Sequence, residues 1–148
     1  MSIRPADASD LEAIHAVVRG AYAPFVPRIG REPAPMNADY AGLIARREVW
    51  VATDSDGVIG VLVLRPQPDS LLLENVAVAP ACQGRGIGRA LIAFAEKHAR
   101  ELGLGEMTLY TNERMTENLH FYPRLGYIET ERRVEEGFSR VFFHKPLT

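Results

Sequence analysis

The 148-residue sequence is poor in cysteine, in long apolar runs and in excess charge of either sign, and each shortage excludes a class of protein. A single cysteine, Cys82, can neither close an internal disulfide nor begin a cysteine-rich zinc site, so a reducing compartment is expected. The longest apolar run, near residues 58–64, is far too short to span a membrane. A net charge of −2 with dispersed basic residues provides no footprint for nucleic acid.

The remaining composition is that of an ordinary globular protein, with 47% hydrophobic and 24% charged residues. A chain of this length can bury a core without a metal or disulfide, so we predict one domain over residues 1–148 and no metal. The first seven residues lack the apolar segment of a signal peptide. We therefore expect a cytoplasmic protein that binds neither membranes nor nucleic acid.

Hydrophobic periodicity and turn residues predict seven strands and four helices. Because strands outnumber helices and several strands are joined by hairpins, the order indicates an α+β fold with a mixed sheet rather than a doubly wound fold. One predicted helix begins after Asp7 or Ser9, and the other three cover residues 37–47, 86–102 and 116–124. The predicted strands cover residues 3–5, 48–53, 58–64, 71–79, 107–111, 127–134 and 138–145.

Residues 21–36 contain four prolines and a glycine. Proline removes a backbone donor and restricts its neighbour, so we predict that this segment has no regular structure. It is either a packed surface loop or a loop that faces a substrate, and the sequence favours neither interpretation.

The most informative segment is the run Gln-Gly-Arg-Gly-Ile-Gly at residues 83–88, between a predicted strand and a predicted helix. Free N–H groups at a helix start carry partial positive charge, and glycines let a bulky anion approach them. The alternative is a glycine-rich cap without a ligand. Each glycine costs a helix about 0.8–1 kcal/mol relative to alanine, which favours an anion site. Arg85 and Arg89 could add charge-assisted contacts.

Two common nucleotide motifs do not fit this segment. The ATP-binding P-loop needs Gly-Lys-Ser/Thr where the sequence has Gly88, Arg89 and Ala90. The dinucleotide fingerprint needs a third glycine at the position of Arg89. Instead, residues 83–88 resemble the Gln/Arg-x-x-Gly-x-Gly/Ala signature of the GNAT superfamily of acyl-CoA-dependent N-acyltransferases, and residues 122–127 resemble its Tyr-x-x-Leu-Gly-Phe/Tyr block.

The resemblance covers nearly the whole chain, because the order of predicted elements also matches the family. It implies a GNAT fold, in which a mostly antiparallel, twisted sheet contains two splayed central parallel strands, here residues 71–79 and 107–111. It also implies acetyl-CoA as co-substrate. Backbone groups around the glycine turn would hold its pyrophosphate, at Gln83, Gly84, Arg85, Gly86, Ile87, Gly88 and Arg89.

The pantetheine arm would lie between the splayed strands, against the main chain of Val76, Ala77 and Val78, for which core packing is the alternative. Many members of the family have an asparagine seven residues before the tyrosine of the second block, where this chain has Met115. Asn112 or Asn118 could take its place, or could serve only as turn or cap residues.

The resemblance assigns Tyr122 as the acid that protonates the departing thiolate, with a buried structural tyrosine as the alternative. Glu74 is the candidate base because a carboxylate is unusual in an apolar strand, and strand alternation predicts that it shares a face with Val76 and Val78. The other interpretation is that Glu74 pairs with an arginine, and some members of the family use ordered water as the base.

The acceptor would be a primary amine of a small molecule or peptide, and a homodimer is possible. Tyr22, Arg28 and Met36 could shape its pocket, with Arg28 available for a carboxylate. The main rival hypothesis is an acyl-CoA-binding sensor without activity, and a nucleotide-binding regulator is the remote one. Tyr122 favours an enzyme, because binding alone requires no acid at sulfur.

Overall fold

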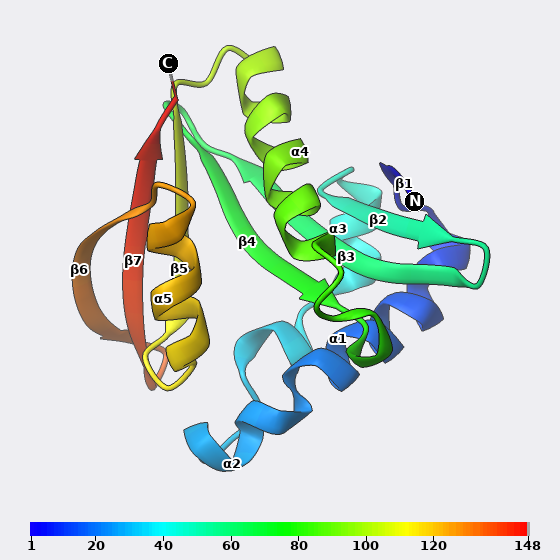
Figure 1. Cartoon of the computed structure of the whole chain (residues 1–148), viewed down its shortest axis with the longest axis horizontal. Helices are drawn as coiled ribbons and strands as arrows, with labels where there is room; N and C mark the ends of the chain where they lie inside the picture. Colours follow the sequence, from blue (N-terminus) through cyan, green and yellow to red (C-terminus); the bar gives the residue numbers. More distant parts are fainter. Residues whose placement is uncertain (148) are drawn as a thin grey trace.

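The computed structural model describes residues 1–147, so Thr148, the last residue of the predicted domain, lies outside the described residues. Seven strands form one mixed sheet in the order β1-β2-β3-β4-β5-β7-β6 (Figure 1). The predicted fold class is confirmed. The strands are β1 (Ser2–Pro5), β2 (Val49–Asp54), β3 (Gly57–Pro66), β4 (Leu71–Val78), β5 (Glu106–Asn112), β6 (Ile128–Glu135) and β7 (Phe138–Pro146). The helices are α1 (Leu11–Tyr22), the single-turn α2 (Val26–Ile29), α3 (Tyr40–Ala45), α4 (Ile87–Glu101) and α5 (Thr116–Arg124).

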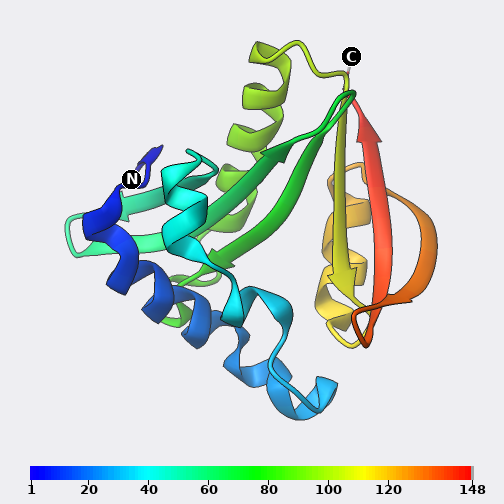
Figure 2. The same ribbon diagram turned by 180° about the vertical axis from the view of Figure 1, so that it is seen from behind.

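The sheet separates two hydrophobic cores, with α4 on one face and α1 and α3 on the other (Figures 1 and 2). On one face, Leu91 and Ile92 of α4 pack with Leu71 of β4. On the other face, Ile14 of α1 and Leu43 of α3 belong to the second core. The periodic apolar residues of each helix therefore mark the face that it buries. Among residues 1–147, no helix combines the length and apolar character needed to cross a bilayer.

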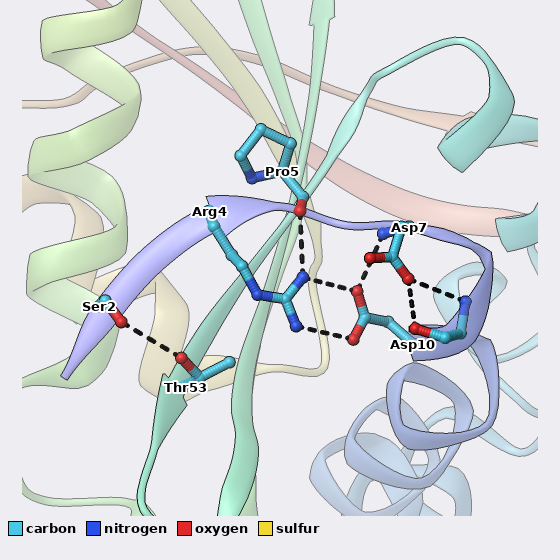
Figure 3. A network of polar contacts seen from close by, with 7 residues as sticks. Ser2, Arg4, Pro5, Asp7, Asp10 and Thr53 are labelled. Carbon is cyan, nitrogen blue, oxygen red and sulfur yellow. Dashed lines mark hydrogen bonds and ion pairs between the residues drawn. The ribbon is translucent and has the colours of Figure 1, made fainter.

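The start of α1 is fixed by a polar network at the N-terminus (Figure 3). The predicted cap, Asp7, accepts a hydrogen bond from Ser9 N at 2.9 Å and opens a short 3-10 turn, Ala8–Asp10, that leads into α1. Asp10 accepts two hydrogen bonds from Arg4, at 2.8 and 2.9 Å. Such a bidentate pair ties β1 to the first helix and thereby sets the direction of α1.

The segment at residues 21–36 differs from the prediction, because it is mostly helical. The structure has the 3-10 turn Ala23–Phe25, then α2, then the 3-10 turn Ala34–Asn37. Pro24, Pro27 and Pro35 each lie in the first turn of one of these short elements. A helix does not need a backbone donor there, so proline begins these turns rather than preventing them.

The two central strands are parallel but separate almost at once. Pairing between β4 and β5 covers only Leu71–Leu73 against Met107–Leu109, and the strands then diverge (Figure 2). Every other pair of neighbours in the sheet is antiparallel. The C-terminal half of β4 therefore lacks a strand on one side.

A β-bulge in β4 changes which face each side chain occupies. Val63 of β3 pairs with Asn75 and the next residue, Leu64, pairs with Leu73, so Glu74 is the extra residue. Leu73 packs in the core beneath α4 before the bulge, and Val76 packs against that core after it. The prediction that Glu74 shares a face with Val76 and Val78 is therefore wrong, because the bulge interrupts strand alternation.

Candidate functional site

An open cleft of about 770 Å³ lies where β4 and β5 diverge. Residues from α1 and α2, the glycine turn, the start of α4 and α5 line it. The structure thus brings most of the predicted cofactor residues to one place, whereas Arg85 is exposed and is not part of the lining. The predicted residues that line the cleft are Val76, Ala77, Val78, Gln83, Gly84, Gly86, Ile87, Gly88, Arg89 and Asn118.

A smaller cavity of about 50 Å³ lies deeper in the splay, between β4 and β5. Apolar side chains such as Pro33, Leu73 and Phe138 line it together with polar groups. The junction between the cleft and this inner cavity is made by the residues that line both. These are Tyr22, Val76, Met115, Asn118 and Tyr122.

The glycine turn needs glycine for its backbone conformation. Gly84 and Gly86 have φ angles of 83° and 79°, in the left-handed region, and a Cβ at either would meet no atom within 4 Å. Gly86 is the N-cap of α4 and offers no side chain to the first N–H groups of the helix. These donors are left open at the cleft, as anion binding requires.

The backbone of β4 also presents free groups to the splay. Ala79 N donates to Ile59 O at 2.9 Å, and bonded pairs alternate with non-bonded pairs along an antiparallel ladder. Ala77 therefore bonds to β3, whereas Val76 and Val78 direct their N–H and C=O groups toward the side that β5 has left. The two valines that the resemblance indicated are thus the ones with an open backbone edge.

Two side chains already contact this open edge. Gln83 Nε2 donates to the carbonyl of Val78 at 3.2 Å, and the Tyr22 hydroxyl lies 3.3 Å from the carbonyl of Val76. Gln83, the first residue of the glycine-turn motif, therefore connects the turn to β4.

Tyr122 of α5 stands at the junction with only 5% of its surface exposed. Its ring lies edge-on to Tyr127 and tilted against Phe143, with centroid distances of 5.8 and 6.0 Å. Burial raises the pKa of Tyr122 well above its usual range. Within residues 1–147 its hydroxyl makes no hydrogen bond, so a protonated phenol is held rigidly with its donor available.

Glu74 lines the inner cavity from the bulge, on the side of the sheet that carries α3. Its carboxylate lies 3.4 Å from Arg65 Nη1, and its side chain is 27% exposed. The base and the ion-pair partner, the two roles that the sequence suggested for Glu74, are therefore both compatible with its position, because Glu74 has an arginine partner and also reaches the cavity.

Asn75, the residue after Glu74, also lines the inner cavity, although no sequence pattern predicted it as a site residue. Its side chain is 4% exposed and bonds to two tyrosine hydroxyls, with Oδ1 2.5 Å from Tyr22 and Nδ2 2.9 Å from Tyr40. An amide in an otherwise apolar strand was a signal of the same kind as the carboxylate beside it.

The predicted acceptor residues have different locations. Tyr22 lines both the cleft and the inner cavity. Arg28 lines the outer cleft but not the inner cavity, and its guanidinium donates to Glu117 at 2.6 and 3.0 Å, so this chain already supplies its carboxylate. Met36 is buried in the core beneath α1 and lines neither cavity, so its prediction as a pocket residue is wrong.

The two candidate asparagines also differ. Asn112 Oδ1 accepts from Arg114 N at 2.9 Å, which is turn chemistry, although the residue lines the inner cavity. Asn118 Nδ2 donates to Thr111 Oγ1 at 3.0 Å, and Asn118 lies at the junction. Asn118 is therefore the better placed of the two for a ligand in the cleft.

An arginine that no motif indicated closes the inner cavity. Arg140 of β7 is 8% exposed, and its guanidinium lies 4.4 Å from the centre of the Tyr110 ring. Its charge is matched by Glu135 at 3.0 Å. No group of three His, Cys, Asp or Glu residues within the described 147 residues could hold a metal ion.

A family model for the acetyltransferase (GNAT) domain matches residues 45–129. Among curated proteins, mycothiol acetyltransferase of Rhodococcus erythropolis is 38% identical over 95 residues, covering 60% of this chain and 31% of the relative. N-alpha-acetyltransferase 80 of Mus musculus is 44% identical over 89 residues, covering 54% and 27%. The matches thus span less than a third of the length of these curated relatives.

Solved structures share the fold over nearly the full chain. The PaiA N-acetyltransferase of Thermoplasma acidophilum, in complex with coenzyme A, superposes with a TM-score of 0.83 at 19% identity, covering 98% of both chains. The ribosomal-protein-S18-alanine N-acetyltransferase of Escherichia coli superposes with a TM-score of 0.80 at 19% identity, covering 99% of this chain and 94% of the other.

Proposed function

Since the chain belongs to the GNAT acetyltransferase family, we propose that it transfers an acetyl group from acetyl-CoA to a primary amine of a small molecule or peptide. The main support is the junction between the two cavities. There the unbonded hydroxyl of Tyr122 and the open backbone edge at Val76 meet. One substrate can reach this junction from the outer cleft and the other from the inner cavity.

Acetyl-CoA occupies the outer cleft in this proposal. Its pyrophosphate accepts hydrogen bonds from the open N–H groups at the start of α4, with Arg89 on the same wall. Its pantetheine arm pairs with the Val76 carbonyl and the Val78 N–H and extends β4 on the side that lacks a strand. The thioester then reaches the junction beside Tyr122.

The amine attacks the thioester carbon directly from the inner cavity. The nitrogen–carbon bond forms, the carbon–sulfur bond breaks, and the backbone N–H of Val76, at the junction, stabilises the oxyanion. The amine gives its proton to Glu74 or to an ordered water, and Tyr122 gives its proton to the leaving thiolate. Holding both substrates at one junction supplies much of the acceleration.

The raised pKa of Tyr122 is compatible with this role. It keeps the phenol protonated throughout the neutral range. The same apolar surroundings remove water from the thiolate and raise its basicity, since desolvation disfavours every anion. The pKa of the Tyr122 phenol and the pKa of the CoA thiol are therefore raised together.

The test is release of CoA thiol from acetyl-CoA with a panel of butylamine, 2-phenylethylamine, 1,4-diaminobutane and an alanine-led tetrapeptide. We expect at least one amine to be acetylated and the Tyr122→Phe variant to bind acetyl-CoA but turn over slowly. Tight binding of acetyl-CoA without transfer to any amine would instead favour the acyl-CoA sensor, which the cleft and glycine turn alone could serve.

A further inference from the structure

A chain of hydrogen bonds runs from the 3-10 turn Ala34–Asn37 to the junction of the two cavities. Tyr40 Oη lies 2.6 Å from the carbonyl oxygen of Pro35 and 2.9 Å from Asn75 Nδ2. At the other end of the amide, Asn75 Oδ1 lies 2.5 Å from Tyr22 Oη. The Asn75 and Tyr40 side chains are almost fully buried, so water does not compete for these contacts.

The donor direction of every bond in this chain follows from its first member. A carbonyl oxygen can only accept, so the Tyr40 hydroxyl donates to Pro35. Tyr40 Oη therefore accepts from Asn75 Nδ2, which fixes the orientation of the amide. Asn75 then presents Oδ1 to Tyr22, and the Tyr22 hydroxyl donates its only hydrogen to this acceptor at 2.5 Å rather than to the Val76 carbonyl, which is farther away at 3.3 Å.

The Tyr22 hydroxyl lies at the open edge of β4, 3.3 Å from the Val76 carbonyl, and Tyr22 lines both cavities together with Tyr122. Because its hydrogen is committed to Asn75, Tyr22 Oη offers only lone pairs to a ligand at the junction. Burial keeps the group neutral by raising the pKa of Tyr22 well above its usual range. Two phenols of opposite function thus meet there, with Tyr122 as donor and Tyr22 as acceptor.

We propose that Tyr22 Oη accepts a hydrogen bond from an N–H of the attacking amine and so aims the nitrogen lone pair at the thioester carbon. Asn75 and Tyr40 are positioning residues, which keep Tyr22 in the acceptor role. This inference rests on the proposed acetyl transfer and specifies which groups its acceptor must carry. A nitrogen nucleophile with at least one N–H is required, and a nucleophile without an N–H is not oriented.

The kinetic test compares wild type, Tyr22→Phe and Tyr40→Phe, using acetyl-CoA and the amines of the panel above. Tyr22→Phe removes the acceptor. Tyr40→Phe allows the Asn75 amide to rotate by about 180° and donate to Tyr22 Oη. The lone pair that would accept from the amine is then occupied, although Tyr22 itself is unchanged. Both variants should lower kcat/KM for the amine about tenfold, the size expected from one hydrogen bond of about 1.4 kcal/mol, while the Kd for acetyl-CoA changes less than about twofold.

Tyr127→Phe is the matched control. It also deletes a buried tyrosine hydroxyl that makes a hydrogen bond, at 3.0 Å to Glu96, but it keeps the ring that packs against Tyr122, and Tyr127 lines neither cavity. We expect comparable destabilisation and unchanged kcat/KM for the amine. If Tyr22→Phe does not fold, Tyr40→Phe against Tyr127→Phe is sufficient for the comparison.

A second measurement tests the chain of hydrogen bonds and needs no amine substrate. The side-chain NH₂ signals of Asn75 in ¹H–¹⁵N spectra should be protected from exchange in wild type and Tyr127→Phe, and should move to new chemical shifts in Tyr40→Phe, where the amide changes its partner from Tyr40 to Tyr22. Unprotected wild-type signals would overturn the inference.

The kinetic outcomes separate the two proposals. No transfer by wild type to any amine overturns the proposed function and this inference with it. Transfer by wild type with equal kcat/KM in the Tyr22 and Tyr40 variants overturns the inference alone and leaves acetyl transfer intact.

Discussion

Arg28 Nη1 lies 2.6 Å from Glu117 Oε1, and this ion pair joins α2 to α5 at the outer cleft. A second bond of 3.0 Å makes the contact bidentate. The hydrogen bonds from Arg28 lower the pKa of Glu117 to about 2. The contact therefore persists at a pH where most carboxyl groups are protonated.

Replacing Arg28 by glutamine should raise the pKa of Glu117 toward 4.5, its ordinary value, while the bonds from its own backbone N–H and from Thr116 still lower it. A lowered pKa stabilises the folded state above pH 4.5, and that contribution is lost as the pH falls toward 2. The free energy of unfolding of Arg28→Gln should therefore fall less than that of wild type over the same pH range. A ¹³C titration of the carboxyl groups measures the shift, with Glu129, whose partner is Arg132, as the internal reference. A Glu117 pKa near 2 in Arg28→Gln would contradict the assignment.

Tyr122→Phe should lower kcat roughly 10²–10⁴-fold, the usual contribution of a general acid. The acetyl-CoA Kd should stay unchanged, since the ring contacts with Tyr127 and Phe143 are retained. Because the pKa of Tyr122 is raised, the wild-type rate should show no loss from phenol ionisation up to about pH 10. Initial rates across pH test both points, and a kcat equal to wild type would remove Tyr122 from the mechanism.

Glu74→Gln should lower kcat at neutral pH, if Glu74 takes the proton of the amine. Glu48→Gln is the matched control, since Glu48 also lies near Arg65, at 3.6 Å, but lines neither cavity. Equal kcat values for the two variants would assign the proton to ordered water and leave Glu74 as an ion-pair partner of Arg65.

Gly86→Ala should destabilise the protein by about 1–2 kcal/mol, because its φ of 79° is strained for any residue with a Cβ. Gly103→Ala should cost a similar amount, since Gly103 has a φ of 76° and equally open surroundings. Only the Gly86 variant should also weaken acetyl-CoA binding, by about tenfold, or about 1.4 kcal/mol. Thermal melts and calorimetric titrations separate the two effects, and equal acetyl-CoA affinities would place the pyrophosphate elsewhere.

The parts of the site that the sequence predicted depend on neighbouring residues. The glycine turn is one short run whose φ angles need glycine, and Tyr122 belongs to a helix predicted with the observed bounds. Helix periodicity and turn chemistry act over a few residues, so a single sequence is enough to read them.

The parts that were missed depend on contacts between distant segments. The face of Glu74 is set by the register of β4 against β3, which local alternation does not reveal. Asn75 bonds to tyrosines 53 and 35 residues away. Arg140 reaches the inner cavity only because β7 pairs with β5. No local pattern records these contacts, although a lone amide in an apolar strand indicated that Asn75 needed partners.

The short pairing of β4 with β5 has a consequence for the stability of the sheet. Three residues of each strand fasten one half of the sheet to the other, and the amides of Val76 and Val78 then face an empty edge. A pantetheine arm bound there would act as the missing eighth strand. The melting temperature should then climb with the logarithm of acetyl-CoA concentration, and hydrogen exchange should slow first at those two valines.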